Sequence, residues 1–251
     1  MMKNCLIILT GWAVGKFVWK PLCEMLKQDY NITFIDWEDV TSADGFEDKV
    51  KALIREKGIE RFSIIGWSLG SLVAIDIAAN FLSQIDRMIL FSATSRFIQD
   101  ETGYYKIGWN RKIIDRMIFS LKERPVEILD SFYKNLFTSS EVSGGYYEYF
   151  LKEMQHVNKN YPVQYLSAGL EYLIMKDLRE NLGSIDIPTL LIHGGDDRIC
   201  PVEAGAYVNN CLKTSEMVVL AETGHAPFFT KTNQCWEVIK NHTANRGGKY
   251  D

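Results

Sequence analysis

Two hydrophobic patterns alternate along the chain. Short apolar runs rich in isoleucine, leucine and valine are separated by longer segments whose apolar residues recur at helical spacing. This alternation is typical of β-α units, and it predicts an α/β fold with a mostly parallel sheet of about six strands and helices on both faces. The predicted strands are Leu6–Leu9, Ile32–Asp36, Phe62–Ile65, Arg87–Ser92, Thr189–His193 and Met217–Ala221. The predicted helices are Lys16–Gln28, Gly45–Glu56, Leu69–Phe81, Val202–Cys211 and Pro227–Asn241.

The segment 94–187 interrupts this alternation. It has no pattern of a buried strand, and it is dense in aromatic residues at helical spacing. We expect a helical cap inserted into a single domain of residues 1–251, because a long insertion beside a sheet edge commonly forms a lid over a substrate site. The alternative is a small second domain without a catalytic role. The cap helices are expected at Trp109–Leu121, Pro125–Phe137, Gly145–Met154 and Val163–Met175.

Composition narrows the class of protein. Hydrophobic residues make up 47% and charged residues 24% of the 251 residues, which is typical of a globular protein with a packed core. A net charge of −4 without long runs of like charge argues against nucleic-acid binding. The apolar run at the N-terminus ends at Gly11 and is too short for a signal sequence or a membrane span. The five cysteines are scattered without a C-x-x-C pair, so we expect reduced thiols and no metal site. Without a signal sequence, the protein is expected in the cytoplasm, and it is expected to be a monomer.

A candidate nucleophile follows the third predicted strand. The residues Gly66-Trp67-Ser68-Leu69-Gly70 have the G-x-S-x-G pattern, with a strand before them and a helix after them. This context predicts a tight strand-to-helix turn in which the two glycines relieve crowding and Ser68 is presented at the start of the helix. There the amide of Leu69 is expected to donate to a negative charge developing on a substrate oxygen.

A serine nucleophile needs a base, and the chain offers four histidines. His156 lies in the cap, His242 lies in a C-terminal stretch expected to be frayed, and His193 ends a predicted strand. His225 is the preferred base. It lies in the loop after the last predicted strand, which ends at the sheet edge where open parallel sheets bind ligands.

The residue that orients this base is expected after the penultimate strand. Asp197 is preferred because it lies in the pattern G-x-x-D-x-x-x-P that ends at Pro201, with Asp196 as the alternative; these acids are also consistent with simple helix caps. A second oxyanion donor is expected from the amide of Trp12, in the glycine-bearing loop after the first strand. This requires the first strand to lie between the second and the third.

Together these loops resemble those of the α/β-hydrolase superfamily, from the first predicted strand to the last. Within it the chain resembles the pimeloyl-acyl-carrier-protein methyl ester esterases of biotin synthesis. One departure is Thr10, where most of these relatives have a histidine. The matching segments are Gly11-Trp12, Gly66–Gly70, Ala168–Leu173 with Asp177–Arg179, and His225–Phe228.

The resemblance implies a serine carboxylesterase with the triad Ser68, Asp197 and His225. It further implies oxyanion donors at Trp12 and Leu69, both also in contact with the substrate, and Phe132 of the cap along an acyl channel. No metal or cofactor is implied. The aromatic residues that are candidates for lining this channel, or for simple core, are Trp67, Trp109, Phe132, Tyr133 and Phe137.

The implied substrate is a methyl ester carried on acyl carrier protein, an acidic partner. The cap has a concentration of basic residues that either attracts this partner or forms a solvated helix face. An esterase or thioesterase of different acyl specificity and a non-catalytic ligand-binding protein are the alternatives. The basic residues are Lys106, Arg111, Lys112, Arg116, Lys122 and Arg124.

Overall fold

The computed structural model describes residues 3–100, 102–157 and 161–244, and it contains a six-stranded parallel sheet. The strand order is β2-β1-β3-β4-β5-β6, so the first strand lies between the second and the third, as predicted. All six predicted strands are confirmed, with ends shifted by two residues or fewer. The strands are β1 (Asn4–Leu9), β2 (Tyr30–Ile35), β3 (Phe62–Trp67), β4 (Ile85–Phe91), β5 (Thr189–Gly194) and β6 (Ser215–Leu220).

The apolar runs mark the centre of the sheet. β3 and β5 are buried at every position, whereas the edge strands β2 and β6 are mostly half-buried. A central parallel strand is covered by helices on both faces, so each of its side chains enters the core and its sequence reads as a continuous apolar run. The loops that follow the strands then meet at the carboxyl edge of the sheet, where the candidate residues lie.

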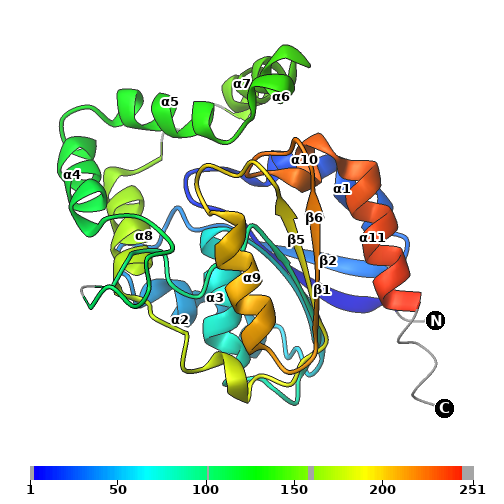
Figure 1. Cartoon of the computed structure of the whole chain (residues 1–251). Helices are drawn as coiled ribbons and strands as arrows, with labels where there is room; N and C mark the ends of the chain where they lie inside the picture. The colour runs from blue at the N-terminus through cyan, green and yellow to red at the C-terminus, as the bar shows by residue number, and fades with distance from the viewer. Residues whose placement is uncertain (1–2, 101, 158–160, 245–251) are drawn as a thin grey trace.

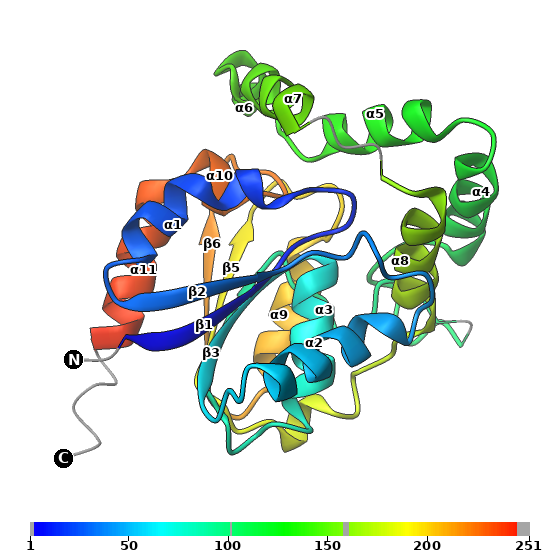
Figure 2. The ribbon, with the colours of Figure 1, turned by 180° about the vertical axis from the view of Figure 1, so that it is seen from behind.

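Helices cover both faces of the sheet (Figures 1 and 2), with α1 and α11 on one face and α2, α3 and α9 on the other. The helix predicted from Lys16 begins as a 3-10 turn, η1, because Pro21 is tolerated only in the first turn of an α-helix, which starts at Lys20. The helix predicted from Pro227 is interrupted at Lys231, whose backbone is not helical. The bounds are η1 (Lys16–Trp19), α1 (Lys20–Leu26), α2 (Gly45–Glu56), α3 (Leu69–Ala78), η2 (Leu182–Ser184), α9 (Val202–Cys211), α10 (Pro227–Thr230) and α11 (Thr232–Ala244).

The C-terminal helix corrects one expectation. α11 continues through His242, which is buried and lies 3.3 Å from Glu216. The helix is therefore not frayed at His242, whose side chain packs in the domain beside the carboxylate of Glu216. The rest of the stretch expected to fray, residues 245–251, lies outside the described residues.

Among the described residues, five α-helices and the short 3-10 helix η2 lie between β4 and β5, in the segment 94–187 that we call the cap. α5, α6 and α7 lie beyond the ends toward which β5 and β6 point, farthest from the sheet, whereas α8 lies beside α3 and packs against α4 (Figure 1). The short helix α6 was not predicted, because its five residues are too few to show a hydrophobic period. The cap helices are α4 (Arg111–Leu121), α5 (Pro125–Asn135), α6 (Ser139–Ser143), α7 (Tyr146–Val157) and α8 (Val163–Met175).

The two ends of the cap are tied together where they leave the sheet. Asp177, just after α8, forms ion pairs with Arg96 and Arg179, and Leu178 N–H donates to the carbonyl of Ser95 at 2.8 Å. The hydrogen bond from Arg179, with that from Arg96, overcomes partial burial and lowers the pKa of Asp177 to about 2. The segment Asp177–Arg179 therefore closes the base of the cap. Within the described residues, no helix has the length and apolarity needed to cross a membrane.

Candidate active site

Ser68 occupies a strained turn between β3 and α3. Its φ of 55° and ψ of −117° lie in a region that non-glycine residues rarely adopt. The turn is crowded: a Cβ on Gly66 would lie 2.5 Å from the carbonyl oxygen of Gly70, and a Cβ on Gly70 would lie 2.3 Å from that of Leu9. The glycines of the pattern are thus required by backbone contact.

Hydrogen bonds hold this turn against β4 and α3. Ser68 N–H donates to the carbonyl of Phe91 at 3.0 Å, and the Ser68 carbonyl accepts from Ser71 N–H and Leu72 N–H. Leu69 is the first residue of α3, so its amide has no acceptor within the helix. The positive end of the helix dipole therefore lies directly beside Ser68.

Asp197 and His225 form a buried pair. Nδ1 of His225 lies 2.9 and 2.8 Å from the two carboxylate oxygens of Asp197. Asp197 also accepts hydrogen bonds from Ile199 N–H and Cys200 N–H, both at 2.9 Å. Burial raises the pKa of Asp197, but the charge and hydrogen bond of His225, with smaller contributions from His193 and Cys200, outweigh it and hold the pKa below its ordinary value.

The neighbouring acid has a different environment. Asp196 is exposed, and its N–H donates to the carbonyl of Thr223 at 3.0 Å. The structure thus brings Asp197, and not Asp196, against His225.

The His225 loop is anchored from three sides. Its N–H donates to the carbonyl of Leu136 in the cap at 2.8 Å, and its carbonyl accepts from Trp67 Nε1 at 2.7 Å and from the Ser92 hydroxyl at 2.9 Å. The ring nitrogen Nε2 is buried and has no hydrogen-bond partner among the described residues. This nitrogen is therefore available to accept a proton.

Ser68 is not hydrogen-bonded to His225 in the described structure. The thiol of Cys200 lies close to this serine. Burial and the charge of Asp197 raise the pKa of Cys200 well above its ordinary value, so the thiol stays protonated. A hydrogen bond between Ser68 and Nε2 of His225 therefore requires a change in the position of one of the two side chains.

His193 lies on the other side of Asp197. It is fully buried at the end of β5, its Nε2 lies 2.8 Å from the carbonyl of Cys200 and 3.5 Å from Asp197, and burial lowers its pKa. Its position is away from the cavity described below. The side chain of His156 lies outside the described residues. No group of three or more His, Cys, Asp or Glu side chains in the described ranges is arranged to hold a metal ion.

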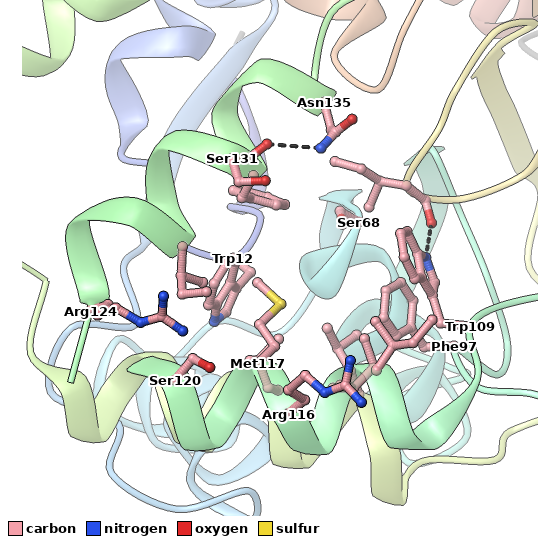
Figure 3. A pocket seen from close by; sticks show the side chains of 17 residues that line it. Trp12, Ser68, Phe97, Trp109, Arg116, Met117, Ser120, Arg124, Ser131 and Asn135 are labelled. Carbon is pink, nitrogen blue, oxygen red and sulfur yellow. Dashed lines mark hydrogen bonds between the residues drawn. The ribbon is translucent and has the colours of Figure 1, made fainter. Parts of the chain in front are cut away.

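Ser68 opens into a cavity of about 390 Å³ between the sheet edge and the cap (Figure 3). Most of its surface is apolar and comes from α4, α5 and α8 of the cap, together with Trp12 from the loop after β1. The polar side chains at the cavity are Ser68, Arg116, Ser120, Arg124, Ser131 and Asn135.

Two of the five aromatic candidates line this cavity. Phe132 does so and contacts Trp12 edge to face, with ring centroids 4.8 Å apart; Trp109 lies on another side. Trp67, Tyr133 and Phe137 do not line it and follow the other expectation, since they are buried in the hydrophobic core. Helical spacing does not distinguish between these two environments.

Sequence reasoning missed most of the apolar lining. Phe97 comes from the connection after β4, Leu170 and Leu173 come from α8, and Ile199 comes from the acid loop. Each is an apolar residue, and no local signal in the sequence separates an apolar lining residue from a core residue. All six basic candidates of the cap are exposed, and two of them, Arg116 and Arg124, also line the cavity.

The arrangement of elements is that of a known family. A sequence model described as the alpha/beta hydrolase fold matches residues 20–232, which include Ser68, Asp197 and His225. The chain belongs to the α/β-hydrolase family.

Curated relatives match this α/β hydrolase over nearly its whole length. It is 27% identical over 241 residues to the pimeloyl-[acyl-carrier protein] methyl ester esterase of Nitrosomonas europaea, which covers 93% of this chain and 94% of the relative. It is 26% identical to the enzyme of the same name from Legionella pneumophila, over 91% of this chain and 90% of the relative. It is also 29% identical to the AB hydrolase superfamily protein YisY of Bacillus subtilis, over 93% and 89%.

Solved structures share the fold at low sequence identity. An esterase from Exiguobacterium antarcticum superposes with a TM-score of 0.82 at 18% identity, over 96% of this chain and 92% of that one. An enol-lactonase from Burkholderia xenovorans superposes with a TM-score of 0.83 at 15% identity, over 97% and 92%. These likenesses confirm the predicted α/β-hydrolase fold.

Proposed function

We propose that this α/β hydrolase is a serine carboxylesterase with Ser68 as nucleophile, His225 as general base and Asp197 as the residue that orients the base. The observation that carries the proposal is the buried Asp197–His225 pair beside a strained serine that opens into an apolar cavity. When Nδ1–H of His225 donates to Asp197, the imidazole carries its proton on Nδ1 and leaves Nε2 free to accept the proton of the serine hydroxyl.

The reaction proceeds in two acyl transfers. The oxygen of Ser68 attacks the ester carbonyl while Nε2 of His225 takes its proton. The tetrahedral intermediate collapses to the acyl-serine, and imidazolium Nε2 gives the proton to the leaving methoxide, which departs as methanol. Water then attacks the acyl-serine with His225 again as base, which releases the acid and restores Ser68.

The negative oxygen of each intermediate is stabilised by the amides of Leu69 and Trp12. Leu69 N–H has no acceptor in α3, and Trp12 lies in the loop after β1, next to β3. Each such donor contributes about 3 kcal/mol to lowering the barrier. Trp12 and Phe132 would contact the acyl group, since they form adjoining walls of the cavity. The side chain of Leu69 is buried and does not line the cavity, so Leu69 would contact the substrate through its amide.

The substrate we propose is pimeloyl-acyl carrier protein methyl ester, cleaved in the cytoplasm during biotin synthesis by a monomeric enzyme with residues 94–187 as its cap. The relatives named for this reaction support the proposal. The apolar cavity suits a methylene chain, and Arg116 and Arg124 at the cavity suit the anionic groups of a carrier-bound substrate. An esterase of different acyl specificity would use the same proposed triad.

The decisive experiment compares two substrates with the purified protein. We expect kcat/KM for the carrier-bound pimeloyl methyl ester to exceed that for p-nitrophenyl butyrate. Ser68→Ala should lower kcat for both by about 10⁴-fold or more, whereas Ser63→Ala, on the same strand away from the turn, should change it by less than about threefold. The gene should also restore biotin-free growth to a bacterial strain that lacks its own methyl esterase.

The outcomes separate the two levels of the proposal. A strong preference for p-nitrophenyl butyrate, with no growth rescue, would exclude the carrier-bound substrate and leave a serine esterase. A wild-type protein that hydrolyses neither ester, and whose Ser68 does not react with a fluorophosphonate, would exclude the esterase itself and favour a ligand-binding protein.

A further inference from the structure

The loop after β1 contains a second strained residue, Ala13. Its φ of 54° lies in the left-handed region, which is unfavourable for a residue with a Cβ. Ala13 follows directly after Trp12, whose amide is the proposed oxyanion donor. A residue in this conformation persists only where its surroundings hold it there.

Two tyrosine hydroxyls from the cap hold Ala13 on both sides. Ala13 N–H donates to the hydroxyl oxygen of Tyr165 in α8 at 2.8 Å. The hydroxyl of Tyr133 in α5 donates to the Ala13 carbonyl at 2.9 Å. The two peptide groups that flank Ala13 are therefore each fixed by a side chain more than a hundred residues away in the sequence.

The neighbouring residues are held as well. Trp12 Nε1 donates to the carbonyl of Leu166 in α8 at 2.9 Å, and the Thr10 carbonyl accepts from Trp37 Nε1 at 2.9 Å. A Cβ on Gly169 would lie 2.5 Å from the indole of Trp12, so the glycine of α8 makes room for that ring. The loop after β1 thus contacts α8 at three of its residues, Tyr165, Leu166 and Gly169.

Both tyrosines are in a position to act as fixed, neutral groups. Their side chains are 5% and 2% exposed, and burial raises the pKa of each well above its ordinary value. A neutral hydroxyl donates one hydrogen bond and accepts others. In this neutral form Tyr133 is able to donate to the carbonyl of Ala13 and Tyr165 to accept from its amide.

We propose that Tyr133 and Tyr165 are positioning residues that hold Ala13 in its left-handed conformation and thereby orient the Trp12 amide toward the oxyanion. The inference rests on the proposed esterase function. Without these hydroxyls Ala13 relaxes to an ordinary backbone conformation, and the Trp12–Ala13 peptide group turns. The preceding peptide group, Gly11–Trp12, carries the Trp12 N–H and is displaced with it, because the two groups share the Cα of Trp12. The cap would then contribute to the chemical step through the oxyanion hole, in addition to enclosing the acyl chain.

The test replaces each hydroxyl by hydrogen. Losing a whole oxyanion donor lowers kcat by 10²–10³-fold, so for Tyr165→Phe or Tyr133→Phe, which would only misalign one, we expect a fall in kcat of about tenfold, with KM changed by less than about twofold. The double variant should lose about as much as a missing donor. The rate at which a fluorophosphonate labels Ser68 should fall in parallel, because that reaction also develops charge on an oxygen.

Tyr172→Phe is the matched control. Tyr172 lies in the same helix as Tyr165, is equally buried, and donates its hydroxyl to Asp76 at 2.9 Å, away from the loop. It should lower the unfolding temperature as much as Tyr165→Phe while leaving kcat within about twofold, since a lost buried hydrogen bond costs a similar amount at either site.

The result is decided with p-nitrophenyl butyrate, so it does not depend on the carrier substrate. An equal fall of kcat in Tyr165→Phe and Tyr172→Phe, or a rise in KM alone, would overturn the positioning role. A wild-type protein without hydrolysis or labelling would overturn the proposed function and this inference with it. Failure on the carrier substrate alone would overturn only the substrate assignment.

Discussion

Individual hydrogen bonds fix the orientation of the carboxylate and the imidazole in the Asp197–His225 pair. Asp197 accepts two backbone N–H groups in addition to the imidazole, so its carboxylate cannot rotate away from His225 without breaking both. A buried carboxylate satisfied in this way stays ionised and fixes the tautomer of its partner. The chemistry of the site thus depends on the charge of Asp197 more than on its bulk.

Asp197→Asn tests this at the residue scale. The amide keeps an oxygen for the Ile199 and Cys200 N–H groups, but its NH₂ would face Nδ1 and favour the tautomer with the proton on Nε2. That nitrogen then cannot accept the proton of Ser68, and we expect kcat to fall by about 10³–10⁴-fold with little change in KM.

The control is the adjacent acid. Asp196→Asn removes an exposed charge whose side chain does not contact His225, and kcat should stay within about twofold. Steady-state kinetics of both variants decide the matter: similar losses of kcat would mean that the pair is not specific to Asp197.

At the scale of elements, the short helix α6 joins the cap to the histidine loop. Glu141 is buried; it accepts from Thr138 N–H at 2.8 Å, which caps α6, and from Gly224 N–H at 3.1 Å, directly before His225. Its other oxygen accepts from the Thr230 hydroxyl in α10 at 2.5 Å. One carboxylate therefore connects α6, the His225 loop and α10.

We expect Glu141→Ala to weaken both the fold and the reaction. It leaves the buried N–H groups of Thr138 and Gly224 without an acceptor, which should lower the free energy of unfolding by about 2–4 kcal/mol. The loosened His225 loop should also lower kcat more than it raises KM. Urea unfolding and kinetics below the transition measure the two effects separately.

Glu148→Ala provides the comparison, because Glu148 is exposed on the neighbouring helix α7. Its unfolding free energy should change by no more than about 0.5 kcal/mol. A Glu141→Ala protein with wild-type kcat would show that the connection stabilises the cap without positioning His225.

At the scale of the whole molecule, a local concentration of positive charge contrasts with the negative net charge of the chain. The chain has a formal charge of −4, yet residues 106–124 of the cap contain six exposed basic side chains against two acidic ones, Asp115 and Glu123, and Arg116 and Arg124 reach the cavity. An acidic partner is repelled by most of the surface and attracted to this part of it, which favours a defined orientation on encounter.

The double reversal Arg116→Glu with Arg124→Glu tests this field. We expect kcat/KM for the carrier-bound ester to fall by about tenfold or more at low salt, and the loss to shrink as ionic strength rises and screens the charges. Hydrolysis of the uncharged p-nitrophenyl butyrate should change by less than about threefold.

Lys57→Glu with Lys213→Glu is the charge-matched control. Both lysines are exposed and precede β3 and β6, at the opposite edge of the sheet from the cavity. An equal loss of carrier activity in this variant would mean that net charge alone, and not the cap, governs the encounter.

The sequence by itself determined the sheet, most helices and the candidate nucleophile. Six apolar runs predicted six strands because a central parallel strand buries both of its faces, and the G-x-S-x-G pattern marked Ser68 because backbone crowding at that turn admits only glycine at Gly66 and Gly70. These features depend on residues that are close together in the sequence, so local spacing is enough to predict them.

Only the tertiary structure decided which side chains contact each other and which line the cavity. It placed Asp197 and not Asp196 against His225, directed Phe132 to the cavity but Tyr133 to the loop after β1, and brought Glu141 beside Gly224. Two adjacent acids or aromatics have the same local pattern, and the direction of each side chain is set by packing between segments far apart in the chain. The cavity beside Ser68 and the support of the loop after β1 therefore arise from the way the cap packs on the sheet.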